Sequence, residues 1–363
     1  MSTHPVKKEI RKIKLTLTTA CNLSCKYCFV QKTNEKMSFP VAKKSINLLL
    51  GSTGEDKLLS MYGGEPSLEM DLIEKIVDYA KKKAKKHKKK LTISICTNLA
   101  ELTDRQINFF KKNDIKITVS VIGPAKIHDQ YRFFSGGKGT QAVVLKNLER
   151  LSKKISKRNI GISYCIIPSI SNKIYDNFEF VSALGFFNFN FEIIQDFEKW
   201  RKEDQRNFSQ SFKKIIINLL KDVNKNNFAY INTINWELVN DKMTEIQNVH
   251  CQIKYNIEVY PSGEMAFSPF LLNDKHKRSY LIGNIRHGID KKYEKCEFNP
   301  KNKRCIDCRN KSYSQDKKWD NAHTIIAMYN KMSIEAARVI KKKAENNEIF
   351  NEYVKGVKEH LSF

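Results

Sequence analysis

Long apolar runs are absent from this 363-residue sequence. None approaches the roughly 20 residues that a membrane-spanning helix needs. The first residues, MSTHPVKKEIRK, also lack the apolar segment of a secretory signal peptide. These absences argue against a membrane protein or an exported one and predict a cytoplasmic protein. In a reducing compartment, the nine cysteines are expected to be metal ligands or buried thiols rather than disulfides.

Acidic residues are scarce: 39 Asp and Glu stand against 65 Lys and Arg, which gives a net charge of +26. Such an excess favours an acidic peptide or a nucleic acid as partner. The densest run, KKKAKKHKKK at 81–90, lacks the arginines and aromatics that nucleic-acid surfaces interleave with lysine. It continues a helical apolar pattern, so a solvent-exposed helix end is the favoured interpretation. A noncatalytic metal protein that binds nucleic acid remains the alternative.

Six apolar segments with strand character alternate with helical patterns over residues 10–230. Alternation of this kind predicts parallel β/α units with right-handed connections, hence an α/β fold built as a partial, open (β/α)6 barrel. Ligands in such sheets sit at the carboxyl ends of the strands. A capping box at Thr103 and Gln106 and a glycine at 185 mark two of the helix ends. The predicted strands lie at 13–17, 58–62, 91–96, 115–122, 160–167 and 187–194.

Three cysteines, Cys21, Cys25 and Cys28, follow the first predicted strand. Three thiols within eight residues, in a loop, have the spacing to bind an iron–sulfur cluster through thiolates and to leave one iron open. A zinc site normally needs a fourth ligand. A disulfide fits poorly with three neighbouring thiols. The sequence therefore predicts a cluster that binds something other than protein.

This spacing, with Tyr27 before the third cysteine, resembles the signature of radical SAM enzymes. The resemblance implies a [4Fe–4S] cluster whose open iron chelates the amino and carboxylate groups of S-adenosylmethionine. It also implies reductive cleavage of that cofactor to a 5′-deoxyadenosyl radical, which abstracts hydrogen from an unactivated carbon. The electron would come from a reductant such as flavodoxin or ferredoxin.

Further segments at predicted strand ends match the same family. GGEP after the second strand resembles the family motif whose glycines approach the methionyl part and whose carboxylate receives the cofactor ammonium; a plain turn is the alternative. Asn98 matches a Thr-Asn-Gly segment in which Leu99 here replaces the glycine. The matching GGEP residues are Gly63, Gly64, Glu65 and Pro66.

A third matching segment follows the fourth strand. Ser120 begins SVIGP, which resembles a Ser-x-Asp-Gly-Pro segment that contacts the ribose, although Ile122 stands where aspartate is usual. His128, Asp129 and Arg132 resemble the next segment, in which the arginine reaches the cofactor carboxylate. A surface-loop salt bridge is the alternative for Arg132.

Two cysteines, Cys96 and Cys165, lie within apolar strands. Free cysteine is commonly a small buried hydrophobic residue, so packing is the simpler interpretation. If either thiol faces the barrel interior, it is a candidate donor of a hydrogen atom to a substrate radical.

The last third of the chain breaks the β/α alternation. A hairpin at 257–269 turns at Pro261-Ser262-Gly263. It is flanked by Cys251 on one side and by Cys296, Cys305 and Cys308 on the other. This order resembles the SPASM and Twitch extensions of radical SAM enzymes, although Ser268 stands where those usually have a cysteine.

Four thiols predict one auxiliary [4Fe–4S] cluster in a subdomain at 245–320, followed by a helical tail at 321–363. A structural zinc on the same four cysteines is the alternative.

The SPASM-like extension implies a ribosomally synthesised precursor peptide as substrate, modified by a cross-link, a thioether or an epimerisation. A protein side chain, as in sulfatase maturation, and a small molecule are the alternatives. No recognisable leader-binding domain precedes Ile13, so the leader would be recognised by the barrel, by the extension or by a separate leader-recognition protein. The charge excess would attract an acidic leader.

Overall fold

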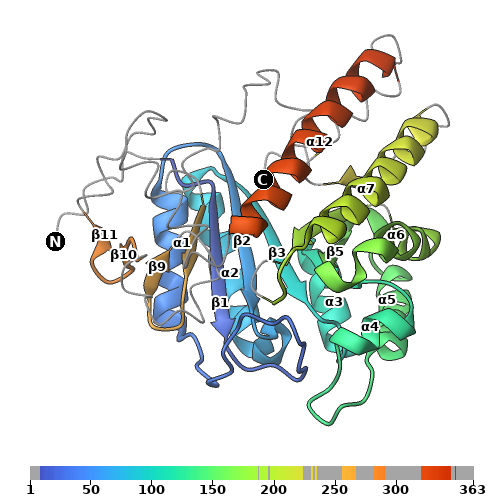
Figure 1. Ribbon diagram of the computed structural model, residues 1–363. Helices are drawn as coiled ribbons and strands as arrows, with labels where there is room; N and C mark the ends of the chain where they lie inside the picture. The colour runs from blue at the N-terminus through green and yellow to red at the C-terminus, as the bar shows by residue number, and fades with distance from the viewer. Residues whose placement is uncertain are drawn as a thin grey trace.

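The architecture was examined in a computed structural model, which describes residues 9–186, 188–194, 197–223, 230–231, 234, 256–266, 281–290, 320–344 and 348. Its centre is a twisted sheet of eleven strands in the order β11-β10-β9-β8-β1-β2-β3-β4-β5-β6-β7 (Figure 1). The sheet has two ends and does not close on itself. Cys251, Ser268, Cys296, Cys305 and Cys308 lie outside the described residues.

The six predicted strands are confirmed, and each pairs in parallel with the next one along the chain. A short strand, β7 (Tyr230–Ile231), adds in parallel to the last of them. The six are β1 (Lys12–Thr18), β2 (Asp56–Gly63), β3 (Lys90–Thr97), β4 (Lys116–Ser120), β5 (Ile160–Ile166) and β6 (Asn188–Ile193).

The predicted helices are present between these strands. The capping box is confirmed. Thr103 Oγ1 accepts a hydrogen bond from the backbone amide of Gln106, and Gln106 Oε1 accepts one from the backbone amide of Thr103. Gly185 has φ +80°, a left-handed turn just after the sixth helix. The helices are α1 (Phe39–Gly51), α2 (Met70–His87), α3 (Asp104–Asn113), α5 (Gln141–Ser152), α6 (Ile174–Ala183) and α7 (Lys202–Val223), with 3-10 turns η1 (Pro66–Glu69), η2 (Lys157–Asn159) and η3 (Pro168–Lys173).

A short helix, α4 (Ala125–Tyr131), was not predicted. It places His128 and Tyr131 in the interior, where both are buried. Its seven residues, about two turns, are too few to show a helical period in the sequence.

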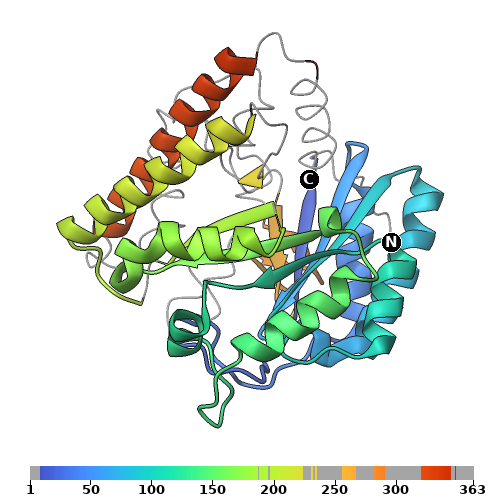
Figure 2. The ribbon, with the colours of Figure 1, turned by 90° about the vertical axis from the view of Figure 1, so that its right-hand side faces the viewer.

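The two faces of the sheet differ. One face carries fully buried apolar residues, such as Ile13 and Leu15 of β1, which pack in a common core with α1 and α2; these helices lie together on that side in Figure 2. The other face, here called the inner face, carries alternate polar residues that are mostly half-buried. Strands of a parallel sheet are usually apolar on both faces. The polar alternation therefore indicates that the inner face is available to bind a ligand.

The predicted C-terminal hairpin is confirmed as β8 (Asn256–Val259) and β9 (Glu264–Ala266), which pair antiparallel. Strand β8 also pairs in parallel with β1, so the hairpin extends the main sheet. Two short strands, β10 (Gly283–Asn284) and β11 (Gly288–Ile289), complete that flank.

In the segment predicted as a helical tail at 321–363, the described residues include one long helix, α12, which runs over Asp320–Ala344. It packs beside α7, and both figures show the two helices side by side (Figures 1 and 2). Tyr329 fills this contact against Phe212, with ring centroids 5.1 Å apart. In the described part of the chain, no helix is long and apolar enough to cross a membrane.

Candidate functional site

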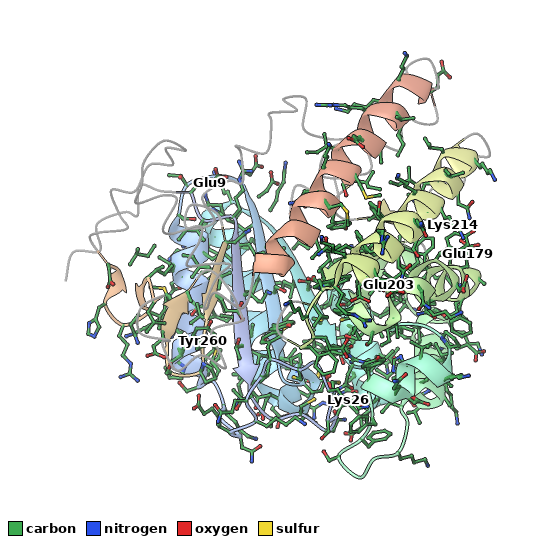
Figure 3. The ribbon with its side chains drawn as sticks, viewed as in Figure 1. Glu9, Lys26, Glu179, Glu203, Lys214 and Tyr260 are labelled. Carbon is green, nitrogen blue, oxygen red and sulfur yellow. The ribbon has the colours of Figure 1, made fainter. Side chains whose placement is uncertain are left out.

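The cysteine loop leaves the carboxyl end of β1 and is fastened to the segment after α4. The Ser24 amide donates to the Phe133 carbonyl at 2.8 Å, and the Lys26 amide donates to the Tyr131 carbonyl at 2.9 Å. Figure 3 shows Lys26 between the end of β1 and α4. The loop is therefore held over the strand ends, where the predicted motifs gather.

The glycines of GGEP allow β2 to approach the start of this loop. The Gly64 amide donates to the Thr18 carbonyl at 2.8 Å, and the Glu65 amide donates to the Ala20 carbonyl at 2.8 Å. A Cβ atom at Gly63 would collide with the Thr18 carbonyl oxygen, and one at Gly64 with that of Ala20. Gly63 also has φ +141°. This packing is a role for the two glycines that the sequence did not reveal.

Glu65 is buried, with 1% of its surface exposed. Its Oε1 accepts from the Ser67 amide at 3.0 Å and from the Thr97 hydroxyl at 2.8 Å, and its Oε2 accepts from the Asn98 amide at 2.7 Å. Burial raises the pKa of this carboxyl, against the lowering effect of these hydrogen bonds. A carboxylate offers about four acceptor positions, so one position on Oε2 remains.

Asn98 connects the end of β3 to the cysteine loop. Its Nδ2 donates to Asn22 Oδ1 at 2.8 Å and lies 3.6 Å from Cys21 Sγ. The next residue, Leu99, has φ +57°, a left-handed conformation that glycine adopts without cost. Leu99 thus adopts a backbone conformation that favours glycine, at the position where the resembling Thr-Asn-Gly segment has glycine.

The three cysteines of the loop differ in exposure: Cys21 and Cys25 are half-buried and Cys28 is exposed. The Leu23 amide donates to Cys21 Sγ at 3.4 Å. Burial raises the pKa of Cys21 to about 11 and also raises that of Cys28. Among the described residues, no three His, Cys, Asp or Glu side chains converge on a point suited to a single metal ion.

Arg132 points from the end of α4 toward the cysteine loop. It is 6% exposed, which shows that the surface-loop alternative is wrong. Its Nη1 donates to Tyr27 Oη at 2.9 Å, and its Nε has no acceptor. Burial disfavours its charged form, but Tyr27, Cys25 and Cys165 nearby raise the pKa of the guanidinium. Among the described residues it forms no ion pair with a carboxylate. A buried cation without an anionic partner in the described part of the chain is costly unless a ligand supplies one.

His128 and Asp129 hold Arg132 in place and do not face the loop. His128 Nε2 lies 3.2 Å from Thr140 Oγ1, which in turn donates to the Arg132 carbonyl at 2.9 Å. Asp129 Oδ1 accepts from the amides of Thr140 and Gln141, each at 2.8 Å, at the start of α5. Burial, with Arg132 nearby, lowers the pKa of His128 to about 3.

Ile122 is fully buried in a small apolar cluster with Tyr131, Cys165, Ile167 and Ile170, against which Tyr27 packs. An aspartate would be poorly accommodated there. Ser120 ends β4, half-buried and level with Ser163. The structure therefore brings Tyr27, Arg132 and Cys165 together, with Ser120 at the neighbouring strand end.

Cys96 lies on the inner face, because its neighbours Ile93 and Ile95 are buried on the opposite one. Burial raises the pKa of Cys96 to about 12, and that of Cys165 to about 11. Both thiols therefore stay protonated at neutral pH.

Charged residues on the inner face were missed in the sequence. They are Lys12 and Lys14 of β1, Glu192 of β6 and Glu258 of β8. Polar and apolar residues alternate with period two in these strands, for example in KIKLT of β1 and NFNFE of β6, and this pattern could have predicted a polar face.

Residues 15–181 match the family model of the Radical SAM superfamily. An uncharacterized protein of Methanocaldococcus jannaschii is 30% identical over 190 residues, which cover 51% of this chain and 63% of that protein. The serine-type anaerobic sulfatase-maturating enzyme of Bacteroides thetaiotaomicron is 30% identical over 185 residues, covering 48% of this chain and 41% of that enzyme. The similarity thus spans only part of each relative.

Two solved structures show the same fold. Native anSMEcpe with bound AdoMet and the Cp18Cys peptide gives a TM-score of 0.70 at 18% identity, covering 94% of this chain and 99% of that chain. Streptococcus suis SuiB bound to the precursor peptide SuiA gives 0.57 at 15% identity, covering 82% and 69%. Residues 15–181 therefore form a radical SAM domain, and the two solved structures share the fold of this chain.

Proposed function

We propose that this protein is an enzyme that reductively cleaves S-adenosylmethionine and modifies a ribosomally synthesised peptide by hydrogen abstraction. The observation that carries the first part is the buried Arg132 guanidinium, which lies beside the three-cysteine loop and has no carboxylate partner among the described residues. A site with thiols and an unmatched buried cation suits a cluster together with an anionic ligand.

The residues present fit the two cofactors that the family implies. A [4Fe–4S] cluster does not require its thiolates to converge on one ion, because each binds a different iron. The Leu23 amide and Asn98 Nδ2 both point at Cys21 Sγ, and hydrogen bonds to sulfur favour the thiolate. The raised pKa values of Cys21 and Cys28 describe the metal-free thiols, and metal binding deprotonates such groups.

When bound, the cluster and S-adenosylmethionine supply an electron and a 5′-deoxyadenosyl radical. In this proposal Cys21, Cys25 and Cys28 hold the cluster. Arg132 binds the cofactor carboxylate, and the remaining acceptor position on Glu65 Oε2 receives its ammonium.

Ser120 lies at a strand end where it would contact the ribose. The apolar cluster around Ile122 and Cys165 limits the access of water. Cys96 and Cys165 retain their S–H bonds at neutral pH, as a donor of a hydrogen atom must.

The proposal of a peptide substrate is supported by similarity to solved structures and by the net charge. Both solved structures named above contain a bound peptide, and the net charge of +26 would attract an acidic leader segment. A cross-link, a thioether or an epimerisation is the proposed change. Oxidation of a protein side chain is the second candidate, which the similarity to a sulfatase-maturating enzyme supports.

The remaining parts of the proposal concern the last third of the chain and the partner proteins. An auxiliary cluster would be held by Cys251, Cys296, Cys305 and Cys308. The chain would divide into a barrel at 10–230, an extension at 245–320 and a helical tail at 321–363. A flavodoxin or ferredoxin would deliver the electron, and a separate protein would recognise the leader.

The first experiment measures 5′-deoxyadenosine formed by the anaerobically reconstituted, reduced protein. Wild type should form it, and a variant with Cys21, Cys25 and Cys28 all changed to Ala should not. Ser24→Ala, in the same loop, is the matched control and should retain activity. Cleavage that persists in the folded triple variant would refute the assignment.

The second experiment tests the substrate. The enzyme is incubated with short peptides encoded beside its gene, and the products are analysed by mass spectrometry. A change in peptide mass that needs S-adenosylmethionine supports the peptide assignment. Modification of a sulfatase-derived sequence alone would favour the second candidate.

A further inference from the structure

The inner face carries two lysines on one strand. Lys12 and Lys14 are two residues apart on β1, so their side chains leave the same face of the sheet, and both are half-buried. The charged groups that face them come from other strands: Glu258 of the adjacent β8, and Glu192 of β6 across the sheet. Cys96 of β3 lies between these flanks.

Lys14 and Glu258 largely satisfy one another. Lys14 Nζ lies 3.8 Å from Glu258 Oε2 and 4.4 Å from the centre of the Tyr62 ring. Glu258 is 2% exposed, and its Oε1 accepts from the Thr16 hydroxyl at 2.9 Å. This carboxylate therefore balances one of the two lysine charges.

Lys12 has no such partner. Within the described ranges it forms no hydrogen bond or ion pair, and the Glu192 carboxylate is bonded to Asn190 of its own strand. Burial, with the charge of Lys14, lowers the pKa of Lys12 to about 8. A partly desolvated cation beside a second cation is destabilising until an anion joins them.

We propose that Lys12 and Lys14 form a carboxylate-binding subsite that anchors the substrate on the inner face. The inference rests on the proposed function and names a substrate class for it: a molecule with a carboxylate group, which an acidic peptide side chain or a free acid would supply. A carboxylate placed between the two ammonium groups relieves their repulsion and gives Lys12 the hydrogen-bond acceptor it lacks.

The position of this subsite fits a bound substrate. Lys14 is level with Ser60 and Ser94 in the sheet, and Cys96 lies two residues further toward the cysteine loop. From Lys14 to the end of β1 at Thr18 the strand rises roughly 13 Å. A substrate anchored at the lysines would therefore extend past Cys96 toward the cofactor, a span suited to a few peptide residues.

The experiment measures binding to the anaerobically reconstituted protein by calorimetry. The probes are a short N-acetylated, C-amidated Gly/Ala peptide with one central Glu, the same peptide with Gln, and free glutarate. Wild type should bind the Glu peptide roughly tenfold more tightly than the Gln peptide, a factor that one added charge pair supplies. Binding of glutarate alone would identify a free acid as the source of the carboxylate.

Variants test the lysines themselves. Lys12→Met and Lys14→Met keep the length of the side chain and should each remove the preference for Glu over Gln. Glu192→Gln should strengthen Glu-peptide binding, because it removes an opposing negative charge. Lys112→Met, on the exposed side of α3, is the matched control and should change nothing.

Equal affinity of wild type for the Glu and Gln peptides, together with no binding of glutarate at millimolar concentration, overturns the subsite. That comparison needs no variant, so misfolding of a lysine variant cannot obscure it. Deoxyadenosine formation is measured on the same samples. If cofactor cleavage persists without carboxylate binding, the subsite fails and the proposed function stands.

Discussion

The buried His128 should make the protein sensitive to acid. Its pKa is lowered from 6.5 to about 3, so the unfolded chain takes up a proton below pH 6.5 while the folded chain does not. Stability from this group is present in full above pH 6.5 and is lost as the pH falls from 6.5 toward 3. With these pKa values, lowering the pH from about 7.5 to about 5 costs about 2 kcal/mol of unfolding free energy.

The substitution His128→Gln removes the titrating group and leaves a neutral polar side chain near Thr140. The variant should be less stable than wild type at pH 7.5, because it disturbs a fully buried position. The difference should shrink by about 2 kcal/mol at pH 5, where wild type has lost the contribution of His128.

Urea denaturation followed by circular dichroism at both pH values measures this difference. His87, exposed on α2, provides the matched control His87→Gln. If wild type and His128→Gln lose stability in parallel between the two pH values, the buried neutral histidine is not the cause and the reasoning fails.

Two other predictions concern the hydrogen bonds around Glu65 and Asn98. Glu65→Gln replaces one acceptor oxygen by an amide donor that must face a protein donor; it should lower stability by about 1.5 to 3 kcal/mol, seen as a lower urea midpoint, and an unchanged midpoint would contradict the assigned bonds. Asn98→Ala removes the donor 3.6 Å from Cys21 Sγ; it should lower the reduction potential of the reconstituted cluster in a redox titration while the iron content stays constant, since a lost donor disfavours the more negative reduced state. A potential equal to that of wild type would show that the contact does not influence the cluster.

The order of strands and helices was predictable because each element carries its own apolar period. The burial of Arg132 was not, since it depends on the packing of α4 against the cysteine loop, and α4 is too short for a recognisable pattern. The partner of β1 on its second side also escaped prediction, because β8 lies far along the chain and nothing local encodes the pairing.

The candidate site likewise has parts that could be predicted from the sequence and parts that could not. The cysteine loop and GGEP are readable as short motifs. The His-Asp-x-x-Arg segment has two roles that only the structure shows. Asp129 accepts hydrogen bonds at the start of α5, and Arg132 points its guanidinium toward Tyr27 of the cysteine loop. The polar inner face is present in the sequence as period-two alternation, but it was not predicted, because strands of a parallel sheet are usually apolar on both faces.

The pairing of β1 with β8 has a consequence for how the chain folds. Thr16 and Glu258 are separated by 242 positions, yet they hydrogen-bond across these neighbouring strands. During synthesis β1 leaves the ribosome well before β8, and the edge of β1 that pairs with β8 stays without this partner until residues 256–259 follow. An unpaired strand edge invites association with other chains, and contacts of such long range form slowly. We therefore expect the newly made barrel to depend on its last third for completion, so that truncated chains ending before β8 aggregate.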